Sequence, residues 1–315
     1  MWQVSGAHGR IDRTKALESM ASHVADGFTT WDLADHYGPA EDLVGEYRRR
    51  HSTERGADAL ANLQFFTKWV PRPGPMTKPV VSAAVATSQR RMATDTLDLL
   101  QFHWWDYADR RYLDALAHLA ELRDAGAIRH LGLTNFDTER LEHILERGIA
   151  IVSNQVQFSL IDRRPEVRMA PWCREHGVHL LAYGAVCGGL LSDKYLGQPE
   201  PRGSALDTVS LQKYKRMVDA WGGWGLFQEL LTVLGSIAAR HGVSIGTVSV
   251  RWVLDRPAVA GVILGRRLGL TDHRAENAEV SAVTLDAEDL ARIDQVASKS
   301  NDLFRSIGDC GDEYR

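Results

Sequence analysis

The chain has 315 residues, of which 44% are hydrophobic and 25% are charged, and its formal net charge is −4. This length suits either two ordinary domains or one barrel of about 250 residues with insertions. A weakly negative chain lacks the positive field that attracts nucleic acid or an anionic membrane, so we expect neither partner. No apolar run reaches the roughly 20 residues that span a bilayer, and the opening MWQVSGAHGRIDRTK has no signal-peptide core, so we expect a soluble protein.

The three cysteines indicate a reducing environment. Cys173, Cys187 and Cys310 lie far apart in the sequence and form no C-x-x-C pair. This spacing argues against both a structural zinc site and a disulfide framework. We therefore expect a cytoplasmic protein without a bound metal. The sequence does not indicate an oligomeric state.

Short apolar or β-branched runs alternate with amphipathic stretches along the whole chain. In order, the candidate strands are MWQVS, FTTWDLA, LQFFTKW, LDLLQFHWW, IRHLGLT, IVSNQVQ, HLLAYG and VAGVIL. Such alternation is typical of a parallel sheet covered by helices. An open sheet that binds a dinucleotide should carry G-x-G-x-x-G after an early strand, and none follows the first or second strand here.

A regular spacing favours a closed barrel over an open sheet. Asp32, Lys68, His103 and Thr134 follow one another at intervals of 31 to 36 residues, as expected of successive βα units. We therefore predict an α/β fold, a (β/α)8 TIM barrel that forms a single domain over residues 1–315.

Two regions depart from this period. Residues from about 185 to 260 form an insertion, and its first part, which ends in DAWGGWG, is rich in Gly, Pro and polar residues and is predicted to be a loop or lid. The second part has apolar residues at helical spacing, which predicts the seventh barrel helix and one extra helix. The tail, about residues 298–315, has little periodicity and is expected to be irregular.

Ionisable side chains end three consecutive predicted strands. Asp32 ends FTTWD, Lys68 ends FFTK and His103 ends LLQFH, and Tyr37 lies in the turn before a helix expected to begin near Ala40. Catalytic groups of parallel barrels lie at such strand ends. A phenol, with an ordinary pKa of about 10, needs a neighbouring ammonium to donate a proton readily, and a buried ammonium needs a carboxylate partner. Lys68 and Asp32 fit those two roles.

Each of these residues also has a purely structural explanation. Asp32 or Asp35 could cap a helix or turn. Lys68, flanked by aromatic residues, could extend its amine to solvent. His103 could be a core histidine. The occurrence of all four residues in register favours a catalytic site.

The motifs that carry these residues resemble those of the aldo-keto reductases. GFTTWDLADHYG is similar to the family's strand-two signature, and the likeness continues through FFTKW, DLLQFHW, GLTNF, SNQVQFSLIDR, LAYGAVCGGLLSDKYLG, VILGRR and HRAEN. The resemblance implies an NADPH-dependent oxidoreductase that transfers a hydride to an aldehyde or ketone while Tyr37 protonates the oxygen. It also implies that Lys68, paired with Asp32, lowers the pKa of Tyr37, and that His103 orients the carbonyl.

The same resemblance implies a cofactor site. Thr134, Asn135 and Gln155 would hydrogen-bond the nicotinamide carboxamide, and Tyr183 would stack on its ring. The remaining residues of that site would surround the pyrophosphate and the adenosine phosphate, and these are Gly184, Gly189, Leu191, Gly265, Arg266, Arg267, His273, Glu276 and Asn277. Unpaired N–H groups at a helix N-terminus, together with arginines, suit a phosphate, so we expect NADPH to be preferred.

Several positions depart from the family's pattern. Leu33 replaces the threonine usual after the signature Asp, and Gly184 replaces the serine usual after the stacking tyrosine. Leu264 stands in place of a proline, and His273 in place of an arginine or glutamine. The chain also begins inside the first expected strand, without the N-terminal hairpin of resembling proteins.

Aromatic residues near the strand ends predict an apolar substrate pocket. Its expected members are Trp2, Trp69, Trp104 and Phe136, and because neighbours on a strand point to opposite sides, only one of Trp104 and Trp105 should face the site. The pair Gly222 and Gly223, flanked by Trp221 and Trp224, could be the hinge of a lid. An apolar wall favours aromatic or extended carbonyl compounds over free sugars.

Two other functions are compatible with this fold class. The first is a non-catalytic NADPH-binding regulatory subunit. The second is a metal-dependent hydrolase, but the twelve histidines lack the ligand spacing that a metal site requires.

Overall fold

The computed structural model describes residues 1–5, 12–265, 268–270 and 272–311. The chain divides into two compact units. Unit 1 comprises Met1–Gln155, Gly265–Asp272 and Tyr314–Arg315, and unit 2 comprises Val156–Leu264 and His273–Glu313.

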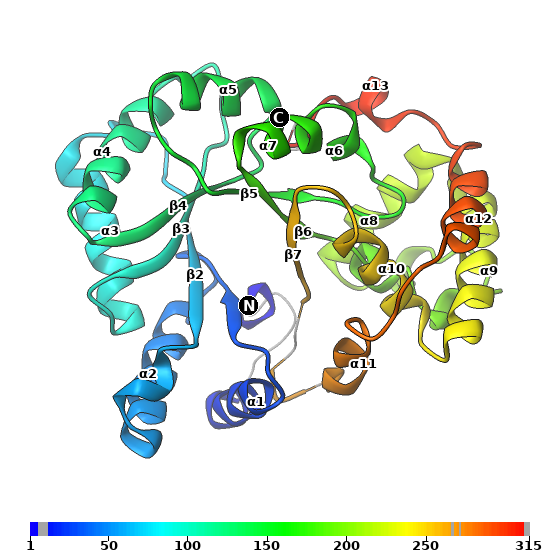
Figure 1. Ribbon diagram of the computed structural model, residues 1–315, viewed down its shortest axis with the longest axis horizontal. Coiled ribbons are helices and arrows are strands. Elements are labelled where there is room, and N and C mark those ends of the chain that lie inside the picture. Colours follow the sequence, from blue (N-terminus) through cyan, green and yellow to red (C-terminus); the bar gives the residue numbers. More distant parts are fainter. Residues whose placement is uncertain (6–11, 266–267, 271, 312–315) are drawn as a thin grey trace. The chain divides into compact units, whose positions relative to one another are not determined.

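Unit 1 is built of parallel strands and helices that alternate along the chain (Figure 1). Adjacent strands in sequence are hydrogen-bonded neighbours, and they are β1 (Thr30–Asp32), β2 (Gln64–Trp69), β3 (Leu97–His103), β4 (Ile128–Thr134) and the first part of β5 (Ser153–Gln157). The helices are α1 (Arg13–Ala25), α2 (Ala40–Arg55), α3 (Lys78–Met92), α4 (Tyr112–Asp124) and α5 (Thr138–Glu146), with the 3-10 helices η1 (Trp2–Ser5) and η2 (Ala57–Leu60). The strands predicted here from FTTWDLA onward, and the helix beginning near Ala40, are confirmed.

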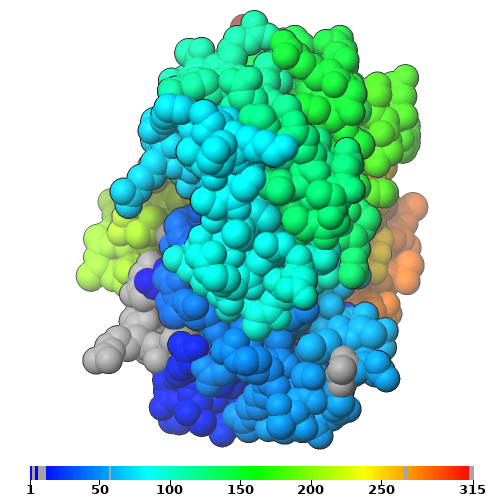
Figure 2. All heavy atoms as spheres, turned by 90° about the vertical axis from the view of Figure 1, so that its left-hand side faces the viewer, coloured from blue at the N-terminus to red at the C-terminus, as the bar shows by residue number. Residues whose placement is uncertain are grey.

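The burial pattern of unit 1 explains this arrangement. Every residue of β3 except Asp98 is buried, as expected of a strand covered on both faces. Helices α2 and α3 pack together and present apolar residues such as Leu43 and Val81 to the core. The outward side chains of α2 to α4 form the blue and cyan surface of Figure 2.

The prediction of a strand in the opening MWQVS is wrong. Trp2–Ser5 form η1, in which the Val4 N–H donates to the carbonyl oxygen of Met1. The Met1 nitrogen in turn donates to the carbonyl oxygen of Asp32 over 2.5 Å, which holds this turn at the end of β1. The described residues therefore contain seven strands where the sequence suggested eight.

Unit 2 is richer in helix than unit 1. It holds the rest of β5 and the parallel pair β6 (His179–Tyr183) and β7 (Val259–Ile263). Its helices are α6 (Arg164–Val167), α7 (Met169–His176), α8 (Val209–Trp221), α9 (Gly223–His241), α10 (Ile245–Leu254), α11 (Arg274–Glu279), α12 (Ala287–Ala297) and α13 (Leu303–Ile307), with the 3-10 helices η3 (Cys187–Gly189), η4 (Asp193–Tyr195) and η5 (Gly203–Ala205). Helices α9 and α10 confirm the predicted helical half of the insertion.

The prediction of a loop for the first half of the insertion is wrong for Val209–Trp221, which form α8. Thr208 caps this helix by accepting from the Leu211 N–H, and Leu211, Tyr214 and Val218 are buried at helical spacing. The surrounding glycines and prolines obscured this spacing in the sequence.

The prediction of an irregular tail is likewise wrong for Leu303–Ile307, which form α13. Asp302 caps this helix by accepting from the Arg305 N–H. No helix in the described ranges is both long and apolar enough to cross a membrane.

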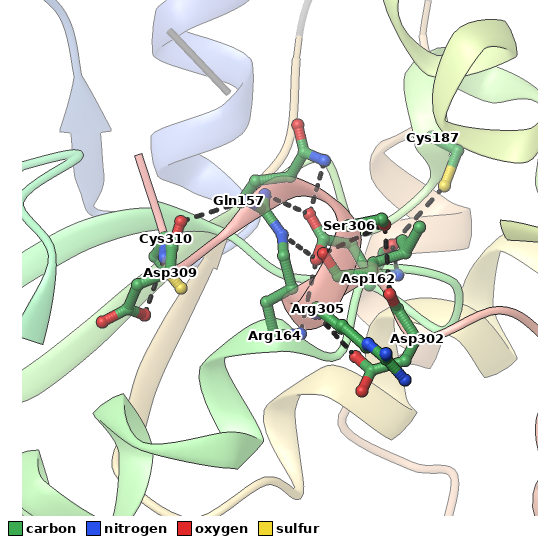
Figure 3. Close-up of polar contacts among 11 residues, drawn as sticks. Gln157, Asp162, Arg164, Cys187, Asp302, Arg305, Ser306, Asp309 and Cys310 are labelled. Carbon is green, nitrogen blue, oxygen red and sulfur yellow. Dashed lines mark hydrogen bonds and ion pairs between the residues drawn. The ribbon is translucent and has the colours of Figure 1, made fainter. Parts of the chain in front are cut away.

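A fully buried ion pair lies in unit 2 between Asp162 and Arg164 (Figure 3). The guanidinium donates twice to the carboxylate, from Nε and from Nη2, each over 2.8 Å. Gln157 donates to the same carboxylate over 2.7 Å, and Arg164 Nη1 donates to the carbonyl oxygen of Asp309. The pair thus ties the segment before α6 to the end of the described chain.

Removal of Arg164 should be costly because it leaves the Asp162 charge buried without its partner. We expect Arg164→Ala to lower the free energy of unfolding by about 3–5 kcal/mol. The matched control is Arg202→Ala, since Arg202 pairs with Glu200 while its side chain is 83% exposed, and its loss should leave the free energy of unfolding nearly unchanged. Urea unfolding followed by circular dichroism measures both. Equal losses of unfolding free energy in the two variants would show that burial does not determine how much an ion pair contributes to stability.

Candidate active site

A buried ion pair lies at the carboxyl ends of β1 and β2. The Lys68 ammonium donates to Asp32 Oδ2 over 2.6 Å and to the carbonyl oxygen of Leu33 over 2.9 Å. Lys68 is only 3% exposed, so it does not extend to solvent. Pro39, whose side chain makes no capping bond, precedes α2, so neither Asp32 nor Asp35 caps that helix. The predicted pairing of Lys68 with Asp32 is confirmed.

Two amides complete the surroundings of the Asp32 carboxylate. Gln101 on β3 and Gln155 on β5 each donate to Asp32 Oδ1, over 2.9 and 2.8 Å. Gln155 also donates to Gln101 over 2.7 Å. The sequence analysis did not identify Gln101, although a polar residue two positions before His103 lies on the same face of a strand. Gln155, expected to bind a carboxamide, here binds the carboxylate.

The ionisation of the pair follows from these contacts. Burial alone would raise the pKa of Asp32, but the charges of Lys68 and of the Met1 amino group, with the hydrogen bonds from Lys68 and Gln101, outweigh it, so the pKa lies below its ordinary value. Burial lowers the pKa of the Lys68 ammonium, and the attraction of Asp32 offsets this in part. The carboxylate is thus held ionised beside the ammonium.

Tyr37 lies beside this pair in the turn between β1 and α2. The Lys68 ammonium is 5.2 Å from the centre of the Tyr37 ring. Burial raises the pKa of Tyr37, and the negative charges of Asp32 and Asp35 act in the same direction. Desolvation is the largest influence, so the pKa of Tyr37 lies above its ordinary value, and the expectation that Lys68 lowers it stays a prediction. The phenol stays protonated at neutral pH.

His103 ends β3, where its backbone pairs in register with Thr134 of β4. Its side chain is buried, and its ring centre lies 4.3 Å from that of Trp105. The four residues predicted to be catalytic, Asp32, Tyr37, Lys68 and His103, all belong to unit 1.

The predicted aromatic pocket needs correction. Trp69, Trp104 and Phe136 are at most 7% exposed, and each packs against Phe102, with ring centres 5.5 to 6.2 Å away. They form the core of unit 1 and do not line an open pocket. Trp105 is 47% exposed, so it is the member of the Trp104 and Trp105 pair that faces outward. The side chain of Trp2 lies outside the described residues.

The residues predicted to bind the carboxamide lie at the ends of β4 and β5. The Thr134 hydroxyl is buried and has no hydrogen-bond partner in the described part of the chain. Asn135 has a φ of 57°, unusual for a residue other than glycine, and its N–H donates to the carbonyl oxygen of Gln155. The orphaned buried hydroxyl of Thr134 is consistent with a polar ligand at this position.

In unit 2, the residues predicted to stack on nicotinamide and to bind pyrophosphate lie at the end of β6 and directly after it. Tyr183 ends β6, and the Lys213 ammonium of α8 lies 5.1 Å from its ring centre. A Cβ atom at Gly184 would lie 2.4 Å from the Tyr214 hydroxyl oxygen, so a serine there would require the Tyr214 ring to move. Gly184 also has a φ of 77°, a left-handed conformation that favours glycine over serine.

Gly189 and Leu191 follow in the same turn. Gly189 has a φ of 100° with open space where a Cβ would be, whereas Leu191 is fully buried. Of the suggested lid hinge, Gly222 lies between α8 and α9 and Gly223 is the first residue of α9, and Trp221 before them is buried in the core. The lid therefore stays a prediction.

The residues predicted to bind the adenosine end lie on α11 or precede it in the sequence. Glu276 accepts from the Ser244 hydroxyl over 2.5 Å, and His273 Nδ1 lies 3.1 Å from the Glu276 carboxylate. Asn277 lies on α11, and Gly265 is exposed after β7. The helix begins only at Arg274, so Gly265 does not open it as predicted. Arg266 and Arg267 lie outside the described residues.

Comparison with known proteins identifies the class of this chain. Residues 1–298 match the Aldo/keto reductase family, and the chain belongs to that oxidoreductase family.

Two relatives illustrate the likeness. The chain is 31% identical over 258 residues to flagellar radial spoke protein 5 of Chlamydomonas reinhardtii, a match that covers 70% of this chain but only 49% of that protein. It is 27% identical over 313 residues to aldo-keto reductase YhdN of Bacillus subtilis, which covers 94% of this chain and 87% of that protein.

A solved structure extends the comparison to the fold. An aldo/keto reductase from Klebsiella pneumoniae in complex with NADP and acetate has a TM-score of 0.66 at 22% identity, covering 90% of this chain and 86% of that one. The predicted α/β class and (β/α)8 barrel fold are confirmed, with seven of the strands in the described residues. The boundaries of a single domain over residues 1–315 stay a prediction.

Loss of one partner of the Asp32 and Lys68 pair should destabilise the protein. We expect Lys68→Met to lower the free energy of unfolding by about 3–5 kcal/mol near neutral pH, because the buried Asp32 carboxylate loses the ammonium that pairs with it. Burial then raises the pKa of Asp32, so the deficit should shrink as the pH falls through that raised value and the carboxyl becomes neutral.

The control for this prediction is Lys78→Met. Lys78 pairs with Glu121 on the surface, where both side chains are more than half exposed, and its loss should cost about 1 kcal/mol or less. Urea unfolding at several pH values compares the variants. If the loss of unfolding free energy in Lys68→Met stayed constant with pH, the interpretation that a buried, ionised Asp32 causes this loss would be wrong.

Proposed function

We propose that this protein is an NADPH-dependent carbonyl reductase that converts an aldehyde or ketone to an alcohol, with Tyr37 as the proton donor. The observation that carries the proposal is the buried Lys68 ammonium, held by Asp32 and lying 5.2 Å from the centre of the Tyr37 ring. A desolvated cation of this kind stabilises negative charge that develops beside it during a reaction.

The proton chemistry follows from the ionisation of the site. A carbonyl that receives a hydride becomes an alkoxide, which is a stronger base than a phenolate. Since burial raises the pKa of Tyr37, the phenol carries its proton at neutral pH and can release it to the forming alkoxide. The Lys68 ammonium then stabilises the phenolate until it is reprotonated. His103, at the end of the adjacent strand β3, would donate a hydrogen bond to the carbonyl oxygen.

NADPH, when bound, would supply the hydride. The orphaned hydroxyl of Thr134 supports a carboxamide ligand at the ends of β4 and β5, with Asn135 beside it. In unit 2, Tyr183 offers an aromatic face, and the turn at Gly189 leaves room for close approach to its backbone. Preference for NADPH over NADH would come from Arg266 and Arg267, and the ratio of the two KM values in their double alanine variant tests this.

A second candidate function is a regulatory or structural subunit that binds the nucleotide without catalysis. The specific observation in its favour is the 31% identity to a protein named as a flagellar radial spoke component. The retained Asp32, Tyr37, Lys68 and His103 favour the enzyme, because a binding subunit has no need of a buried ammonium beside a phenol. The ligand would in either case be a small molecule.

Tyr37→Phe should nearly abolish carbonyl reduction. We expect kcat to fall by about 10²- to 10⁴-fold, the usual loss for a general acid, while the affinity for NADPH stays within about twofold. Steady-state assays with a reactive aldehyde measure the first quantity, and cofactor fluorescence titration measures the second.

Tyr47→Phe is the matched control, since Tyr47 is a buried tyrosine on α2 whose hydroxyl contacts His51 and not the candidate site. It should keep its activity. Retention of more than half of the wild-type kcat by Tyr37→Phe would reject Tyr37 as the donor.

A further inference from the structure

Two buried glutamine side chains contact each other across β4 in unit 1. Gln101 on β3 and Gln155 on β5 are at most 4% exposed. The strand between them, β4, has Gly132 in register with Gln101, so no side chain at that level of β4 separates the two amides. Gln155 Nε2 therefore reaches Gln101 Oε1, to which it donates over 2.7 Å.

The charge of Asp32 fixes which end of each amide faces its carboxylate. An ionised carboxylate only accepts hydrogen bonds, so Gln101 and Gln155 must both turn Nε2 toward Asp32 Oδ1, to which they donate over 2.9 and 2.8 Å. The opposite end of the Gln101 amide, its oxygen, is then the acceptor that faces Gln155. One charge thus determines the direction of all three hydrogen bonds.

These contacts use both N–H groups of Gln155. A primary amide has two N–H donors and one acceptor oxygen. One N–H donates to Asp32 and the other to Gln101, whereas no hydrogen bond within the described ranges uses Gln155 Oε1. The oxygen is therefore the part of this side chain that remains for a ligand, and the ligand group that matches it is a hydrogen-bond donor.

We propose that Gln101 is a positioning residue for the cofactor, which holds the Gln155 amide so that only its oxygen is offered to the nicotinamide carboxamide. This inference rests on the proposed function, in which NADPH supplies the hydride, and on the expected role of Gln155 at its carboxamide. Without Gln101, only the hydrogen bond to Asp32 would hold the Gln155 amide. The amide could then turn and present its released N–H to the ligand.

A cofactor analogue without the amide nitrogen tests this role by binding alone. In reduced 3-acetylpyridine adenine dinucleotide phosphate, a methyl ketone replaces the carboxamide, so the N–H donors are lost. The wild-type protein should bind NADPH more tightly than this analogue. Gln101→Met, which fills similar space without an amide, should reduce that preference by about fivefold, the effect of one net hydrogen bond. Isothermal titration calorimetry gives the ratio of the two Kd values.

Gln101→Glu is the conservative variant. Burial beside the Asp32 carboxylate raises the pKa of the introduced carboxyl, so this group takes up a proton. It then keeps one O–H to donate to Asp32 and one oxygen to accept from Gln155, which is the pattern of the amide that it replaces. This variant should restore the wild-type ratio of Kd values.

Gln157→Met is the matched control. Gln157 is also a buried glutamine that donates to the carboxylate of an ion pair, that of Asp162 with Arg164, but it lies in unit 2. Its substitution also removes a hydrogen bond from a buried carboxylate. It should leave the ratio of Kd values unchanged.

The possible results separate this inference from the proposed function. A preference for NADPH that falls in Gln101→Met alone, and returns in Gln101→Glu, supports the positioning role. The inference is overturned, and the reductase left intact, by an unchanged ratio in Gln101→Met, by the same fall in Gln157→Met, by no recovery in Gln101→Glu, or by no preference in the wild-type protein. Wild-type protein that binds NADPH but transfers no hydride to a reactive aldehyde would instead overturn the proposed function.

Discussion

The burial of two opposite charges, on Asp32 and Lys68, constrains the rest of unit 1. Removal of a carboxylate and an ammonium from water costs several kcal/mol each, and is tolerated only where the remaining hydrogen-bonding capacity is also satisfied. Here the ammonium also binds the carbonyl oxygen of Leu33, and the carboxylate accepts from Gln101 and Gln155. These partners lie on β1, β2, β3 and β5 or directly after them. The network therefore requires the parallel register that brings these strand ends together.

The same network determines the chemistry available at this end of the sheet. Because Lys68 is held by Asp32, it remains a cation in a buried place beside Tyr37. Burial keeps the phenol protonated, and in the proposed reaction the cation would stabilise the phenolate that remains after proton transfer. One ion pair thus contributes both to the architecture of the strand ends and to the proposed proton transfer.

Much of this arrangement could be predicted from the sequence, because strand periodicity and strand-end polar residues are local signals. Seven strands and the pairing of Lys68 with Asp32 followed from them. The η1 turn could not be predicted, because MWQVS has the composition of a strand and its backbone is fixed by contact with Asp32. Which of Trp104 and Trp105 faces outward could not be predicted either, because it depends on the carbonyl oxygens that accept from the Trp104 indole N–H. The pKa of Tyr37 depended on burial, which the sequence does not give.

The most direct test of the catalytic account is a single turnover of the wild-type protein loaded with NADPH that carries deuterium at the transferable C4 position. Mixed with an excess of a reactive aldehyde, it should lose the absorbance of the reduced nicotinamide in one phase. The deuterium should appear on the carbinol carbon of the alcohol formed. Saturated binding of NADPH with no loss of its absorbance and no labelled alcohol would contradict the account, and would leave a nucleotide-binding subunit as the better description.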